Sequence, residues 1–166
     1  MLEYFQTLNR YNRWMNEKLY ATGAAMSDEE RKHDFGAPFR SIHGILNHLL
    51  LTDRMWLGRF KAQPFPARSL DQELYSNFEE LRAERCKTDD EIEAWVVSLD
   101  EQALPAPFTF TSFSIPQTAT LLLWQTALHL FNHQTHHRGQ ITALIEASGH
   151  DCGVTDLAQM VRQEKS

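Results

Sequence analysis

Apolar residues recur at every third or fourth position along four long stretches of the chain, the spacing that places side chains on one face of an α-helix. The first predicted helix spans residues 3–22, and Gly23 is its expected end. The second spans residues 40–61, and the hydroxyl of Ser41 is a candidate N-cap. The predicted inward residues of the first helix are Tyr4, Leu8, Tyr11, Met15 and Leu19.

Two further long helices and a short last one complete the helical pattern. The third is predicted over residues 70–100, a stretch rich in Glu and Arg that we expect to be more exposed than the others. The fourth begins at Pro116, a residue type favoured in the first turn of a helix, and ends near Gly149. The last covers residues 156–162, with Thr155 as its cap.

One segment, LPAPFTFTSFSIP at residues 104–116, interrupts this helical pattern. It carries three prolines and a short alternation, FTFTSF, that fits either a brief hairpin or an extended loop. Four long helices with short or medium connections predict an all-α fold, a four-helix bundle followed by a short C-terminal helix. A length of 166 residues suits one domain, and we expect residues 1–166 to form it.

Composition and charge narrow the classes of function. The chain is 42% apolar and 23% charged, which are ordinary values for a globular protein. A net charge of −6 argues against broad binding of nucleic-acid phosphates, which needs clustered Lys and Arg. No apolar stretch reaches the ~18 residues that span a bilayer, and the N-terminus lacks the apolar region of a signal peptide. The two cysteines form no CxxC motif, which favours reduced thiols and a cytoplasmic protein. From the charge and the short apolar stretches we expect that it binds neither nucleic acid nor membrane.

The stretch HLFNHQTHHRGQ, residues 129–140, holds four of the eight histidines. His133 and His137 lie four positions apart on the apolar stripe of the fourth helix, the spacing at which two imidazoles can reach one metal ion. Hydrogen-bonded core histidines would give the same pattern. A metal would need a third ligand from another helix, and periodicity leaves His43 and His48 of the second helix as equal candidates.

Three motifs give the chain a family resemblance. NHQTHHRGQI resembles the fourth-helix signature of DinB-like (DinB/YfiT) proteins, GILNHLLLTDRMWL resembles their second-helix signature, and RYNRWMNEKL resembles their first helix. The resemblance implies a four-helix bundle in which His48, His133 and His137 hold one divalent metal ion. The resemblance does not assign a ligand role to His43 or His129. Relatives often carry Tyr where this chain has His136, which could be a proton carrier or merely an exposed ring.

A site of three histidines would have definite chemical properties. Neutral nitrogen ligands suit zinc and nickel, which we expect first, and iron or copper as alternatives. Three protein ligands leave a coordination position open for water or a thiol, as in catalytic sites. The resemblance implies a metal-dependent thiol S-transferase or a related thiol-dependent enzyme that uses a low-molecular-weight thiol. A hydrolase is a further reading, and the alternative class is a stress-linked metal-binding or interaction protein without turnover.

Other residues are secondary candidates. Asn47 and Asn132 each precede a proposed ligand and could bind imidazole nitrogens or bridge helices. Candidate pocket residues are Asn12, Trp14, Asp53, Trp56 and Arg138, although packing explains the two tryptophans better. The sequence contains no GxSxG, P-loop or GxGxxG motif. We expect a small-molecule substrate and a homodimer whose interface uses aromatic side chains, unless these fill the end of their own bundle; they are Phe65, Phe108, Phe110 and Phe113.

Overall fold

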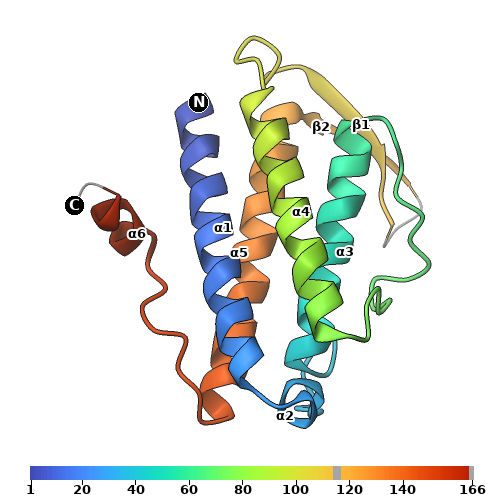
Figure 1. Cartoon of the computed structure of the whole chain (residues 1–166). Coiled ribbons are helices and arrows are strands. Elements are labelled where there is room, and N and C mark those ends of the chain that lie inside the picture. Colours follow the sequence, from blue (N-terminus) through green and yellow to red (C-terminus); the bar gives the residue numbers. More distant parts are fainter. Residues whose placement is uncertain (114–116, 165–166) are drawn as a thin grey trace.

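Four long helices form the body of the protein in the computed structural model, which describes residues 1–113 and 117–164. They are α1 (Leu2–Ala25), α3 (Ile42–Phe60), α4 (Phe78–Val97) and α5 (Leu123–Ala147). In Figure 1 these helices stand side by side, and α1 and α3 each contact both α4 and α5. The prediction of an all-α four-helix bundle is therefore confirmed. None of the described helices is long and apolar enough to cross a membrane.

The four long helices do not simply alternate in direction along the chain. Figure 1 shows α3 and α4 running in the same direction, because the connection at residues 61–77 returns along the length of the bundle. Short helix α2 (Asp28–Lys32) lies in the connection between α1 and α3. The predicted short C-terminal helix is α6 (Leu157–Gln163), which contacts α1. Asp156 rather than Thr155 occupies its N-cap position, and no side chain caps it.

The second predicted helix is the most accurate of the set, and the first needs two corrections. Ser41 caps α3 as expected, since its hydroxyl accepts a hydrogen bond from the amide of Gly44 at 3.0 Å. Helix α1 runs two residues past Gly23, which instead gives room to Phe78: a Cβ at Gly23 would lie 2.9 Å from that ring. Tyr4 is exposed, because the buried face begins at Phe5 instead.

Two predicted helix starts were wrong. Residues 70–77 are not helical, and α4 begins at Phe78 after Asn77, whose side chain accepts from the amide of Glu80 at 3.0 Å. The predicted start at Pro116 lies outside the described residues, but Thr118–Leu122 form strand β2 rather than helix. Strand β2 pairs antiparallel with β1 (Pro107–Thr111), so residues 107–111 do belong to a hairpin, but its second strand lies beyond the segment 104–116 for which a hairpin was one alternative.

The buried interior consists of two apolar clusters separated by polar side chains. One cluster packs near the hairpin and the other near α2. The hairpin-side cluster is Phe5, Trp56, Leu57, Ile92, Trp95, Val96, Leu104, Ala127, Leu130 and Phe131. The α2-side cluster is Met15, Leu19, Tyr20, Met26, Ile42, Ile45, Leu46, Leu49, Leu50, Phe78, Leu81, Ile141, Ile145 and Cys152. We call the buried residues between them the polar layer: Asn12, Asn16, Asp53, Arg85, Asp89, Gln134 and Arg138.

The polar layer takes side chains from all four long helices. Arg85 of α4 forms ion pairs with Asp53 of α3 at 2.6 Å and with Asp89 at 2.9 Å. Asn16 of α1 donates to Asp89 of α4 at 3.0 Å, which ties these two helices together. Arg138 of α5 donates to the side-chain oxygen of Asn12. Two arginines thus balance two carboxylates, as buried charges require.

Candidate metal centre

Three histidines from two helices come together on one side of the polar layer. His48 projects from α3, and His133 and His137 project from α5, so that one nitrogen of each ring lies within 4.8 Å of the other two. The ring centroid of His48 lies 5.2 Å from that of His133 and 4.6 Å from that of His137. The structure thus brings together the three histidines singled out from the sequence. We call them the histidine triad.

Hydrogen bonds orient two of the three rings. Nδ1 of His48 donates to the backbone carbonyl of Leu70 at 2.8 Å, and Nδ1 of His137 donates to the amide oxygen of Gln140 at 2.7 Å. A proton on Nδ1 leaves the lone pair on Nε2, the usual arrangement for a histidine that binds a metal. Leu70 and Gln140 were not identified from the sequence. Gln140 lies three residues after His137 on the same helix, which is a usable sequence signal.

The surroundings keep the triad uncharged. Burial lowers the pKa of His48 to about 4. Burial, followed by the proximity of His137 and His48, lowers the pKa of His133 to about 3. Burial also lowers the pKa of His137. Neutral imidazoles at pH 7 carry the free lone pairs that a metal ion requires, so the donor set fits a divalent cation.

Phe39 forms one wall of the triad. Its ring stacks on His48 with centroids 3.7 Å apart and meets His137 edge-on at 5.6 Å. The backbone of Phe39 is left-handed, with φ of 61°, which is a strained conformation for a bulky side chain. Gly44 makes this turn feasible, because a Cβ there would lie 2.0 Å from the carbonyl oxygen of Phe39. Phe39 could not be identified from the sequence, since a strained loop residue has no periodic pattern.

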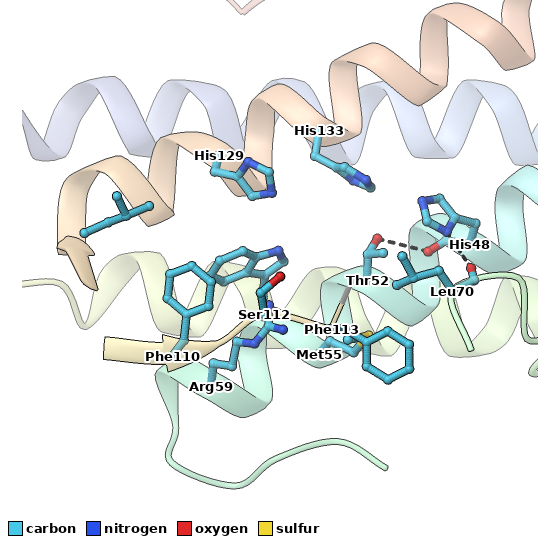
Figure 2. A pocket seen from close by; sticks show the side chains of 12 residues that line it. His48, Thr52, Met55, Arg59, Leu70, Phe110, Ser112, Phe113, His129 and His133 are labelled. Carbon is cyan, nitrogen blue, oxygen red and sulfur yellow. Dashed lines mark hydrogen bonds between the residues drawn. The ribbon is translucent and has the colours of Figure 1, made fainter. Parts of the chain in front are cut away.

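A cavity of about 370 Å³ opens beside the triad (Figure 2). His48 and His133 line it, whereas His137 does not. Figure 2 shows the rings of His48 and His133 facing each other at one end, while Arg59 and Phe110 lie towards the other end. Most of the wall is apolar or aromatic. The remaining lining residues are Thr52, Met55, Trp56, Leu70, Ser112, Phe113, Leu121 and His129.

The other histidines of the two motif helices have separate roles. His43 is buried away from the triad, and its Nε2 donates to the carbonyl of Tyr75 at 2.9 Å. His129 lines the cavity, with its ring 5.1 Å from that of Trp56. His136 is exposed, and its ring lies 4.9 Å from that of His137. Of the two alternatives for His136, the exposed ring agrees with its position at the surface.

Most of the secondary candidates lie outside the cavity. Asn47 does not bind an imidazole: its side-chain oxygen accepts from two backbone amides of the α3–α4 connection, at 2.8 and 2.9 Å. Asn132 is exposed. Trp14 packs against Tyr11 and Lys18, as the packing explanation expects, whereas Trp56 lines the cavity. The three polar candidates, Asn12, Asp53 and Arg138, all belong to the polar layer.

The sequence of this chain is similar to those of known proteins. A sequence model described as the DinB family matches residues 1–165. Protein DinB of Bacillus subtilis (strain 168) is 26% identical over 168 residues, which cover 94% of this chain and 92% of that protein.

Two solved structures are similar in fold. A DinB-like protein from Bacillus cereus ATCC 10987 has a TM-score of 0.59 at 19% identity, over 82% of this chain and 87% of that chain. YfiT from Bacillus subtilis has a TM-score of 0.64 at 17% identity, over 90% of this chain and 87% of that chain. YfiT is described as a probable metal-dependent hydrolase with an unusual four-helix bundle topology.

Proposed function

Because the chain belongs to the DinB family, we propose that it is a metal-dependent enzyme whose divalent ion is held by His48, His133 and His137. One observation carries the proposal: three neutral imidazoles from two helices converge beside a cavity large enough for a small molecule. Three nitrogen ligands favour zinc or nickel, with iron as an alternative. They also leave at least one coordination position for a reactant.

The surroundings of the triad favour catalysis over a purely structural site. His48 and His133 line the cavity, so a reactant in the cavity meets the triad on that side. Phe39 covers His48 and His137 with its ring, which hinders water there. A divalent ion at such a site lowers the pKa of bound water or thiol and so supplies a nucleophile near neutral pH. The protein's own part is to orient the rings and to exclude bulk water.

The reaction that we propose first is thiol S-transfer. The thiolate sulfur of a small thiol would attack an electrophilic carbon of a second molecule, the leaving group would depart with the bonding electrons, and the thiol proton would pass to solvent. The aromatic and aliphatic cavity walls support this proposal, since they suit an apolar electrophile. Hydrolysis is a second candidate, favoured by the description of YfiT as a probable metal-dependent hydrolase.

A spectroscopic titration distinguishes the enzyme from a metal-binding protein without turnover. Protein reloaded with cobalt is titrated with mercaptoethanol, and a sulfur-to-metal charge-transfer band is expected if a coordination position is open to thiols. His133→Ala is the control that should show no band. Absence of the band from fully loaded wild-type protein would exclude thiol activation. Turnover of a chlorodinitrobenzene with mercaptoethanol, compared with hydrolysis of nitrophenyl acetate, then separates the two reactions.

A homodimer is a further proposal. Phe113 and Leu121 of the hairpin region remain 39% and 42% exposed, which supports an apolar contact there. Phe108 and Phe110 instead pack against the hairpin-side cluster, so they fill the end of their own bundle. Light scattering at several concentrations tests the proposal, and a monomer mass throughout would reject it.

A further inference from the structure

Arg59 in the last turn of α3 presents a cation to the cavity. Its guanidinium carbon lies 4.5 Å from the ring centroid of Trp56 and 5.2 Å from that of Phe110. One terminal nitrogen donates to the backbone carbonyl of Thr111 in β1 at 3.1 Å. Two aromatic rings and one carbonyl therefore hold the guanidinium at the cavity wall, where Figure 2 shows it together with Phe110.

This cation has no anionic partner among the described residues. Burial lowers the pKa of Arg59, and no carboxylate offsets that effect. Neighbouring arginines differ: Arg54, on the same helix, pairs with Glu84 at 2.5 Å, and Arg85 pairs with Asp53. The cavity residue His129 is a titratable neighbour, but its pKa is lowered by burial and then by Arg59, and a histidine is neutral or positive, so it cannot balance the guanidinium. A half-buried guanidinium without a counter-charge is ready to bind an anion.

We propose that Arg59 binds a carboxylate group of the small molecule that enters this cavity. This inference rests on the proposed function for its choice of site, but Arg59 would bind the carboxylate whether or not a metal is present. A single guanidinium balances the single charge of a carboxylate, and its planar fork matches the two carboxylate oxygens. A phosphate group carries more negative charge at neutral pH and would call for a second cation. No second unpaired cation lines the cavity among the described residues, so a carboxylate fits better.

The arrangement of the cavity also indicates the shape of the ligand. Between Arg59 and the triad lie Trp56 and His129, with ring centroids 5.1 Å apart, and His129 lies 5.8 Å from His133. A ligand that spans this distance needs an apolar middle, which would lie on these rings. A volume of about 370 Å³ accommodates such a molecule. The expected class is a small organic acid with the reacting group at the end opposite the carboxylate.

Calorimetric titration with two matched probes tests the proposal. Phenylbutyrate and phenylbutyramide have nearly the same shape, but only the first carries a negative charge. The wild-type protein should bind phenylbutyrate at least about tenfold more tightly, the effect of a hydrogen-bonded charge pair. Arg59→Gln should remove the preference. Arg82→Gln, which removes an exposed arginine from α4, should retain it.

The same titrations separate this inference from the proposed function. A carboxylate can also bind a metal ion directly, so the pair of probes is repeated after treatment with EDTA. A preference that survives EDTA but not Arg59→Gln supports the inference, even if the protein proves to hold no metal. A preference that survives Arg59→Gln but not EDTA overturns it. Equal binding of the two probes by the wild type also overturns it, and that comparison needs no variant to fold.

Discussion

Replacing Arg85 by methionine tests whether the polar layer stabilises the bundle. Arg85 is 2% exposed and bridges Asp53 and Asp89, which both stay buried when the guanidinium is removed. Methionine fills much of the same volume, so the cavity left behind is small. Breaking a buried ion pair from one side costs about 3–5 kcal/mol, because a charge is left without its partner. We expect a loss in this range.

The loss of unfolding free energy should not greatly exceed that range, since each carboxylate keeps another hydrogen-bond donor. The side-chain amide of Gln134 donates to Asp53, and Asn16 donates to Asp89. Burial already raises the pKa of Asp53 despite Arg85, so without Arg85 this carboxyl can also escape its charge by taking a proton. The destabilisation should therefore shrink as the pH falls.

Urea unfolding followed by tryptophan fluorescence measures the effect. The matched control is Arg54→Met, which breaks the more exposed ion pair with Glu84 between the same two helices. Because both side chains of this pair keep some contact with water, we expect its loss to cost less than that of Arg85→Met. If Arg85→Met and Arg54→Met lowered the free energy of unfolding by the same small amount, the polar layer would have no special role in holding the helices together.

Three further predictions concern the triad and its supports. Metal-free protein should lose stability as the pH falls below about 6.5, because the unfolded state then binds protons that His48 and His133 do not bind in the folded state. Each of the two should contribute at most about 1.4 kcal/mol per pH unit to the slope, and His133→Ala should remove its own share of the slope in urea titrations. Gly44→Ala should cost about 1–3 kcal/mol and weaken cobalt binding, since a Cβ at that position collides with the carbonyl of Phe39; unchanged melting and affinity would contradict this. Asn47→Ala should cost about 1–3 kcal/mol in urea unfolding, because two backbone amides lose their acceptor, and a loss below ~0.5 kcal/mol would show that water replaces it.

The sequence predicts the bundle and the triad well because both have a local pattern. Helical spacing of apolar residues locates α3, and the hydroxyl of Ser41 marks its start. The pair His133 and His137 shares a helix face by spacing alone. The choice of His48 over His43 did not follow from periodicity: it came from the family motif, and the structure agrees with it.

The features that the sequence does not reveal depend on contacts between distant segments. The polar side chains of Asn9, Asn12 and Asn16 do not by themselves predict burial in α1, which depends on packing against other helices. Thr118–Leu122 has no intrinsic reason to be a strand until it pairs with β1, where the hydroxyls of Thr109 and Thr120 meet at 2.9 Å. Partners of this kind cannot be identified from one sequence.

The metal content of the purified protein tests the central claim most directly. Wild-type protein and five single alanine variants are supplied with zinc and nickel and dialysed. Their metal content is then measured by inductively coupled plasma mass spectrometry. Wild type, His129→Ala and His136→Ala should each hold about one ion per chain, as expected for a single three-histidine site. His48→Ala, His133→Ala and His137→Ala should each hold almost none while remaining folded. Equal metal content in all six proteins, or none in the wild type, would contradict the account.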